Sequence, residues 1–471
     1  MLAKYNFNQP KGLQALFFTE MWERFSYYGM RALLVLYLVK SQNYSEFDAI
    51  HIYAVYTGLV YFTPIIGGYL SDRYLGQQKS ILIGGVTMML GHIFMAFPSL
   101  LNLALGMLII GNGFFKPNIS SLLGKFYKKN DPRRDGGFSF FYIGINIGAF
   151  LAPLIIGYVG ETIGWHYGFS IAAIGMLIGL FHFGLNQKQI IIDDLSNSSS
   201  ILTAKDWLLI FALSALNILI VLSILKLHFF INTYQQAIFL SIILFTTFLI
   251  IKKRKALSSI PTKEFKSIAY IGILSIFVIF FWMGFEQAGG TLTLFASDRV
   301  DRQISGFIIP ASSFQSINPL IIIFLGPFLA SFWMKVDNSK NRLSTSRKMS
   351  LGLIFLGAGF LIMALISQTQ EIKISLWWLV GVYFLHTIGE LCLSPIGLSM
   401  VSRVSPKKLL SLMMGIWFLS SAIANYAAGR IPALLSYLAI DLFIFLMLSS
   451  FIAGTILFIM APTLEKLIHK K

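Results

Sequence analysis

The stretch EMWERFSYYG, residues 20–29, sets two carboxylates and an arginine between the apolar sequences LQALFFT (13–19) and ALLVLYLV (32–39). The composition of the chain shows what kind of helix this is. Hydrophobic residues make up 56% of the 471 residues and charged residues only 12%, about half the charged share of a typical soluble protein. Several apolar runs reach the ~20 residues that a helix needs to cross a bilayer, and they lack the two-residue alternation of a membrane β-barrel. The sequence therefore predicts an all-α polytopic membrane protein.

Fourteen membrane spans are predicted. They cover residues 13–39, 49–70, 78–97, 100–123, 138–158, 164–185, 205–226, 234–251, 267–296, 306–334, 348–367, 374–402, 408–429 and 433–461. If both termini are cytoplasmic, 28 of the 37 Lys and Arg residues fall in inner segments, six in outer loops and three inside spans. This asymmetry follows the positive-inside rule and so favours two cytoplasmic termini. It also explains the net charge of +17 without nucleic-acid binding, and the basic loops would meet anionic lipid headgroups.

The spans are arranged as six, two and six. Residues 1–187 are predicted to form one six-helix bundle, residues 188–266 a linker with two inserted helices, and residues 267–471 a second six-helix bundle. This is the organisation of the major facilitator superfamily, in which the substrate site lies between the halves near mid-membrane. The loop GGYLSDRYLGQQK (67–79) supports this fold, because its D-R-x-x-G-x-x-K pattern resembles the superfamily's loop signature. The Asp and Arg of this loop are expected to latch neighbouring helix ends.

Seven ionisable side chains fall deep inside the predicted spans. They are Glu20, Glu23, Arg24, Arg31, Lys116, Glu286 and Glu390. Each costs ~2.5–3.5 kcal/mol on insertion scales unless it is paired or faces water. Glu20, Glu23 and Arg24 share one helix face, which Tyr27 and Arg31 extend by two more turns. A carboxylate beside Arg24 stays ionised, whereas one that loses its partner takes up a proton, so this cluster can couple protons to motion. A static ion-pair network is the alternative, and the number of charges favours a functional role.

Amides and aromatic residues inside spans are further candidates. Asn146 and Asn318 could bind the backbone of a substrate, or bridge helices. Trp417 and Phe418 could wall a pocket, although such a pair more often belongs to the core. The single cysteine, Cys392, excludes an internal disulfide and a cysteine-based metal cage. No HExxH, GxSxG, CxxC or Walker motif occurs, so we expect neither an enzyme nor an ATP-driven pump, and no metal or cofactor besides protons.

The quoted stretch, extended to EMWERFSYYGMR, resembles the E-x-x-E-R-F-x-Y-Y signature of the proton-coupled oligopeptide transporter family. Further stretches similar to that family are FFKPNISSLLGKFY, FFYIGINIGAFLAP, FFWMGFEQAGGTLTLFASDR, GELCLSPIGLSM and GIWFLSSAIANYAAG. The resemblance covers nearly the whole chain, and bacterial members also carry two inserted helices. It implies a major facilitator fold, the bacterial inner membrane, and a symporter that imports di- and tripeptides with protons by alternating access. We expect the chain to act as a monomer.

The resemblance implies roles for individual residues. Those implied for proton coupling are Glu20, Glu23, Arg24, Lys116 and Glu286. Those implied for peptide binding are Tyr27, Tyr28, Arg31, Tyr61, Lys116, Asn146, Asn318, Glu390, Trp417 and Phe418. Arg31 would meet the carboxylate of the peptide and pair with Glu286 when the outer gate closes, and Glu390 would receive the amino group. Bases in the first half and an acid in the second match the short dipole of a peptide zwitterion.

Two features depart from the family pattern. Ala54 stands where animal members have a proton-coupling histidine, and the nearby His51 is not assigned that role. The sequence EQAGGT has glycine where serine is common in the family. Two other functions stay open: a proton symporter of the same fold for nitrate or an amino-acid-like solute, and a peptide-sensing membrane receptor. The intact E-x-x-E-R motif favours coupling, and Glu390 favours a substrate with an amine.

Overall fold

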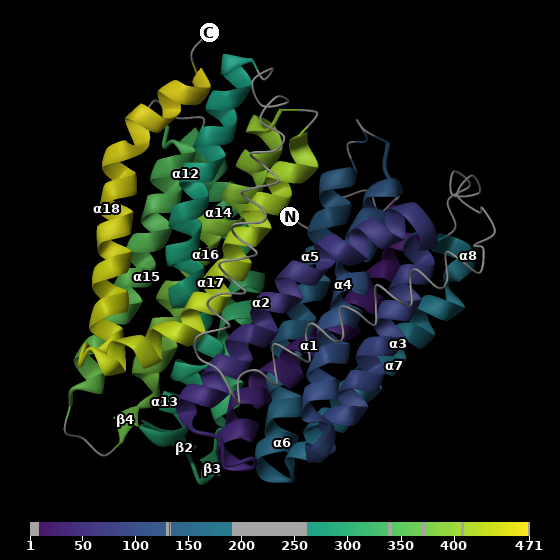
Figure 1. Cartoon of the computed structure of the whole chain (residues 1–471), viewed down its shortest axis with the longest axis vertical. Coiled ribbons are helices and arrows are strands. Elements are labelled where there is room, and N and C mark those ends of the chain that lie inside the picture. The colour runs from purple at the N-terminus through teal and green to yellow at the C-terminus, as the bar shows by residue number, and fades with distance from the viewer. Residues whose placement is uncertain are drawn as a thin grey trace.

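Two groups of long helices lie side by side in the computed structural model (Figure 1). The structure describes residues 9–128, 131, 133–190, 261–337, 342–369, 373–406 and 409–469. Within these ranges, nine helical segments are long and apolar enough to cross a membrane. The two inserted spans predicted at 205–226 and 234–251 lie outside the described residues.

The first group contains the N-terminal helices. Their bounds are α1 Gly12–Lys40, α2 Glu46–Leu70, α3 Gln77–Met95, α4 Leu101–Lys125, α5 Arg134–Ala152, α6 Tyr158–Thr162, α7 Trp165–Leu185 and α8 Gln187–Ile190, with short turns η2 Ser71–Leu75, η3 Pro98–Leu100 and η4 Pro153–Gly157. Helix α1 packs on α5 and α7, and α4 packs on α2 and α3. A Cβ on Gly148 would collide with the carbonyl of Met21, so this glycine lets α5 approach the polar face of α1.

The second group contains the C-terminal helices. Their bounds are α12 Thr262–Phe285, η6 Glu286–Gly289, α13 Thr291–Asp298, η7 Ala311–Ser316, α14 Ile317–Asp337, α15 Thr345–Ser367, α16 Leu376–Val404, α17 Leu410–Tyr437 and α18 Leu442–His469. Helix α15 packs on α16 and α18, and α12 packs on α17 and α18. The two groups touch where α2 meets α17 and where α5 meets α14. These two seams bring residues of both groups around one central space.

Short strands mark one end of the molecule, which we call the strand end (Figure 1). Strand β1 (Val300–Asp301) pairs in parallel with β4 (Ile374–Ser375), and β2 (Gln303–Ile304) pairs antiparallel with β3 (Phe307–Ile308). The prediction of a span beginning at residue 306 is therefore wrong at its start. Ser305 and Gly306 have φ of 48° and 84°, and a two-residue turn with positive φ is typical of a tight β-hairpin.

The last two predicted spans also have wrong boundaries. Their break was placed at 430–432, but α17 continues through Pro432 to Tyr437. A proline is tolerated inside a membrane helix because neighbouring groups satisfy the freed backbone carbonyl. The chain instead turns at Ala439, whose φ is 54°. Asp441 then caps α18 by accepting a hydrogen bond from the backbone N–H of Ile444 at 2.9 Å.

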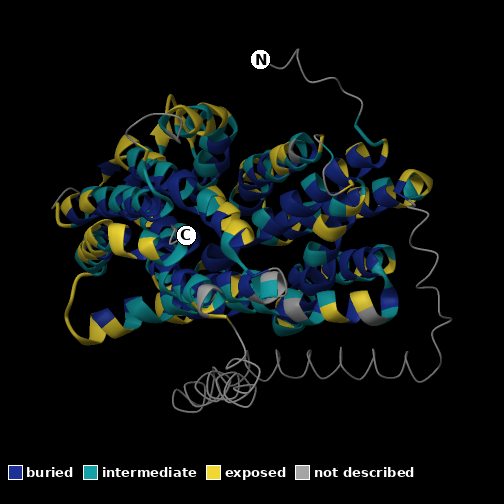
Figure 2. Cartoon of the chain, turned by 90° about the horizontal axis from the view of Figure 1, so that it is seen from above, coloured by how far each residue is buried: buried dark blue, intermediate teal, exposed yellow. Residues whose placement is uncertain are grey.

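Burial separates the outer surface from the interior. In Figure 2 the exposed residues lie mainly on the periphery, and buried residues lie on faces turned toward neighbouring helices. Large apolar side chains such as Phe328 on α14 and Leu177 on α7 are exposed, as expected for a surface that faces lipid. Asp72, in the loop with the superfamily signature, is also exposed, and the latch expected there stays a prediction.

Candidate functional site

A cavity of about 2090 Å³ lies between the two helix groups. The predicted site residues that line it are Glu20, Arg24, Tyr28, Arg31, Tyr61, Lys116, Asn146, Glu286, Asn318, Glu390, Trp417 and Phe418. Glu23 and Tyr27, both buried, lie behind the wall that these residues form. The lining continues to Arg342, Arg403 and Glu465, at the end opposite the strands. The cavity therefore runs from mid-membrane to the end where α18 stops.

Two carboxylates share one guanidinium on α1. The Nε of Arg24 lies 2.8 Å from Oε1 of Glu20, as the i, i+4 spacing of these two residues predicts, and 2.6 Å from Oε2 of the adjacent Glu23. Asn112 on α4 donates a long hydrogen bond of 3.5 Å to the second oxygen of Glu23. Glu20 reaches the cavity, whereas Glu23 is fully buried. One cation thus pairs with two acids at the boundary between the protein interior and the cavity.

Lys116 on α4 contributes a second cation to the same wall. Its ammonium lies 4.3 Å from the centroid of the Tyr61 ring on α2, which is a cation–π contact. Within the described part of the chain, Lys116 forms no ion pair with a carboxylate at 4.0 Å or less. Lys116 lines the cavity together with Tyr61.

An ion pair closes the cavity toward the strand end. Arg31 on α1 pairs with Glu286, which lies in η6 where helix α12 ends. The Nε of Arg31 also donates to the hydroxyl of Tyr53 at 2.6 Å, and that hydroxyl lies 3.5 Å from Oε2 of Glu286. A Cβ on Gly289 would collide with the Tyr53 hydroxyl, so this glycine makes room for the contact. Tyr53 was missed in the sequence, although it lies two turns before Tyr61 on the same helix face.

The position that departs from the family pattern is tightly packed. Ala54 is buried, and a Cβ on Gly429 of α17 would collide with its methyl group. A histidine side chain does not fit between these helices as they are packed here. His51 is also buried and lies against the ring of Tyr426, with centroids 6.2 Å apart. Neither residue lines the cavity.

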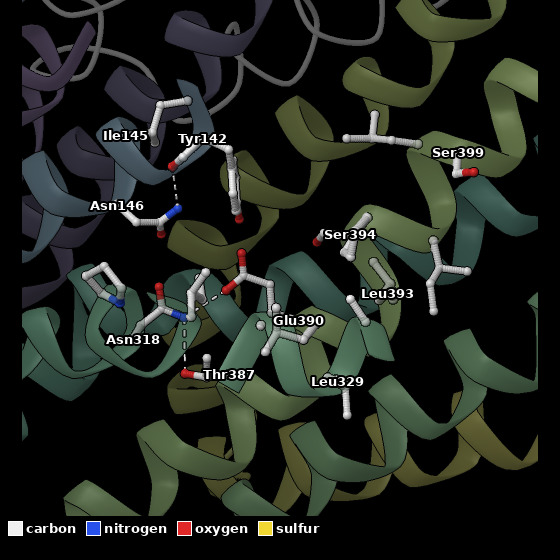
Figure 3. Close-up of a pocket in the computed structure, with 18 of the residues that line it drawn as sticks. Tyr142, Ile145, Asn146, Asn318, Leu329, Thr387, Glu390, Leu393, Ser394 and Ser399 are labelled. Atoms are coloured by element: carbon white, nitrogen blue, oxygen red, sulfur yellow. Dashed lines mark hydrogen bonds between the residues drawn. The ribbon is translucent and has the colours of Figure 1, made fainter. Parts of the chain in front are cut away.

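An acid and an amide of the second helix group face an amide of the first group (Figure 3). The Nδ2 of Asn318 on α14 donates to Oε2 of Glu390 on α16 at 2.7 Å and to Oγ1 of Thr387 at 3.1 Å. Across the seam, Nδ2 of Asn146 on α5 donates to the backbone oxygen of Tyr142 at 2.9 Å. The side-chain oxygens of the two amides point toward one another in Figure 3. Together with Glu390 they form a cluster of hydrogen-bond acceptors.

Two aromatic residues of α17, in the second helix group, line the same cavity. Trp417 is 4% exposed and packs so closely on Gly397 of α16 that a Cβ there would collide with the indole. Phe418 is 44% exposed and lines the open part of the cavity. Trp417 is therefore part of the packed wall, whereas Phe418 presents its ring to the cavity.

A set of contacts between the helix groups lies beyond the ion pair, and we call it the strand-end clamp: Tyr158, Glu161, Arg302, Phe307 and Ser312. Glu161 of α6 accepts hydrogen bonds from the backbone N–H groups of Ala311 and Ser312 at 2.9 and 2.8 Å, and from the Ser312 hydroxyl at 2.5 Å. Arg302 lies 3.9 Å from Glu161, and the rings of Tyr158 and Phe307 stack at 6.0 Å. Glu161 thus caps the first turn of η7 from the opposite group. Sequence reasoning missed it, because its partners lie 150 residues away.

Two groups of membrane helices, a cavity between them that is lined by charged side chains, and a seal at one end of that cavity define a polytopic membrane transporter. The family model described as POT family matches residues 78–451. The chain is 35% identical over 453 residues to peptide transporter YePEPT of Yersinia enterocolitica, covering 90% of this chain and 88% of that one. It is 34% identical over 494 residues to a di-/tripeptide transporter of Lactococcus lactis subsp. cremoris, covering 98% and 97%.

A solved structure shows the same architecture. The crystal structure of a mutant peptide transporter POT in complex with alafosfalin superposes with a TM-score of 0.84 at 35% identity, and covers 99% of this chain and 97% of that one. The chain belongs to the POT family of transporters, which are not enzymes, and its helices adopt the major facilitator-like fold of that family.

Proposed function

We propose that this chain is a proton-coupled symporter that imports di- and tripeptides by alternating access. The observation that carries the proposal is the charge arrangement of the cavity. The cations Arg31 and Lys116 lie on its first-group wall and the acid Glu390 on its second-group wall. A short zwitterionic peptide carries both charges a small distance apart, so it can satisfy both walls at once. The relatives named as peptide transporters support this substrate class.

In the bound state, Arg31 and Lys116 attract the carboxylate of the peptide, and Glu390 receives its amino group. Asn146 and Asn318 present their oxygens to N–H donors of the peptide, and Phe418 faces its side chains. The remaining contacts proposed for the peptide come from Tyr27, Tyr28, Tyr61 and Trp417. Apolar pockets discriminate weakly between side chains, by about 1–3 kcal/mol per methylene, so peptides of many sequences are accepted.

Proton coupling in this proposal uses the two ion-paired clusters. Arg24 pairs with Glu20 and Glu23, and Lys116 is their partner from α4 when the cavity rearranges. A proton on Glu286 weakens its pairing with Arg31, so the seal opens and Arg31 becomes available to the peptide carboxylate. The two helix groups then rock about the central site.

The strand end is proposed to face outward and the opposite end the cytoplasm. The Lys and Arg distribution supports this orientation, in which both termini lie on the cytoplasmic side of the bacterial inner membrane. In this proposal the structure is an inward-open state, because the cavity is sealed at the strand end and reaches the other end. We further propose bundles at residues 1–187 and 267–471, a linker at 188–266, and a monomer as the working unit, since one chain supplies both walls of the site.

The test is uptake of labelled dialanine into proteoliposomes with and without an inward proton gradient. Gradient-dependent accumulation that unlabelled tripeptide suppresses, and that nitrate and free alanine do not, is the expected result. Binding of dialanine without accumulation would support a peptide sensor instead. No binding and no uptake by folded protein would refute the peptide assignment, and a panel of anions and amines would then identify another solute.

A further inference from the structure

Thr387 lies in the wall of the cavity beside the acceptor cluster and contacts Asn318 (Figure 3). It belongs to α16, one turn before Glu390, and its side chain is fully buried. Its hydroxyl donates to the backbone oxygen of Tyr383 at 2.6 Å. A hydroxyl has one proton, so the same oxygen can only accept from Asn318. The 3.1 Å contact between them therefore runs from the Asn318 amide nitrogen to the threonine.

This contact decides which end of the Asn318 amide faces the cavity. The two ends of an amide have nearly the same shape, so hydrogen-bond partners set its orientation. One N–H of Asn318 goes to Thr387 and the other to Glu390. With both N–H groups used inside the wall, the oxygen is the end left for a substrate.

The two partners of Asn318 differ in how firmly they impose this orientation. Glu390 accepts a hydrogen bond when it is ionised, but it donates one when it carries a proton. Its acceptor strength also falls when a bound ammonium competes for its oxygens. The proton of Thr387 is committed to Tyr383 in every one of these states. Thr387 is thus the partner whose polarity does not change during a transport cycle.

We propose that Thr387 is a positioning residue that holds the side-chain oxygen of Asn318 toward the cavity and thereby makes the site selective for substrates with a free amine. If the amide turned, its NH2 group would meet the ammonium of the substrate, donor against donor, and binding would be opposed rather than supported. The inference rests on the proposed peptide transport function, and it assigns the amine selectivity to a buried residue that acts through Asn318.

The experiment compares Thr387→Val, which keeps the shape and removes the hydroxyl, with Thr387→Ser, which keeps the hydroxyl. Thr19→Val is the matched control, because Thr19 is also fully buried and donates to a backbone oxygen one turn earlier, that of Ala15 at 2.7 Å. Gradient-driven uptake of labelled dialanine into proteoliposomes is measured against two competitors. One is unlabelled dialanine, and the other is propionylalanine, which has the same length and lacks the amine.

Thr387→Val is expected to raise the half-inhibiting concentration of dialanine roughly three- to tenfold, as for one lost hydrogen bond, and to leave that of propionylalanine unchanged. Thr387→Ser and Thr19→Val should both behave like the wild type. Half-inhibiting concentrations that stay unchanged for both competitors in Thr387→Val would overturn the inference. An equal rise for both competitors would also overturn it, because it indicates a general packing defect. If Thr387→Val does not fold, Thr387→Ala is measured by the same criteria. Failure of the wild type to take up dialanine would instead refute the proposed function, and the inference with it.

Discussion

Replacing Glu161 by glutamine is expected to loosen the strand-end clamp without changing its shape. The carboxylate accepts three hydrogen bonds from Ala311 and Ser312, and its side chain is only 11% exposed. A glutamine can keep its oxygen toward Ser312, but its NH2 group then faces the N–H of Ala311. The substitution therefore removes one charge-assisted hydrogen bond and the negative charge at the start of η7.

The expected cost is about 2 kcal/mol, since a hydrogen bond to a charged group contributes roughly 1.5–3 kcal/mol. This corresponds to a roughly 30-fold shift toward the open clamp. Amide hydrogen exchange in lipid nanodiscs measures this shift directly, because the backbone N–H groups of Ala311 and Ser312 donate hydrogen bonds to Glu161. Exchange of a peptide covering 311–316 should become roughly 30-fold faster. Glu46→Gln is the control, because Glu46 is an exposed acid at the start of α2, at the same end. Equal exchange in the wild type and in Glu161→Gln would refute the clamp.

Three further substitutions test the cavity and its seal. Glu23→Gln should abolish gradient-driven accumulation and keep counterflow exchange, because it removes a proton-binding carboxylate beside Arg24; normal accumulation would contradict the coupling role. Arg31→Ala should weaken dialanine binding roughly 30-fold, through loss of a charge-assisted contact, whereas the lipid-facing Leu177→Ala should not; equal affinities in calorimetry would count against carboxylate recognition. Gly289→Ala should slow uptake because its methyl collides with both the hydroxyl and the ring of Tyr53; an unchanged rate of uptake would argue against this collision.

The helices of the chain could largely be read from the sequence, but some of their ends could not. The predicted span 13–39 corresponds to α1 at Gly12–Lys40, because apolar length and charge flanks define a membrane helix locally. The start at 306 was wrong because the apolar residues there form a hairpin, stabilised by strand pairing rather than by lipid. The break at Pro432 was wrong because a membrane helix accommodates proline when its surroundings satisfy the backbone.

The sequence by itself determined which side chains share a helix face. Glu20, Glu23 and Arg24 form their ion-paired cluster because the 3.6-residue period places them together whatever surrounds the helix. The same helical periodicity places Thr387 one turn from Glu390. The local sequence does not indicate that Asn318 contacts both of them.

Only the tertiary structure decided the contacts between elements distant in the chain. Tyr53 completes the Arg31–Glu286 pair across 22 and 233 residues, and Glu161 caps η7 across 150. Such distances depend on how whole helices pack, and that packing is set by the sum of many small contacts and close glycine approaches rather than by any short segment. The ionisable groups were therefore visible in the sequence, whereas the partners that orient them, and the end at which the cavity is sealed, followed from the fold.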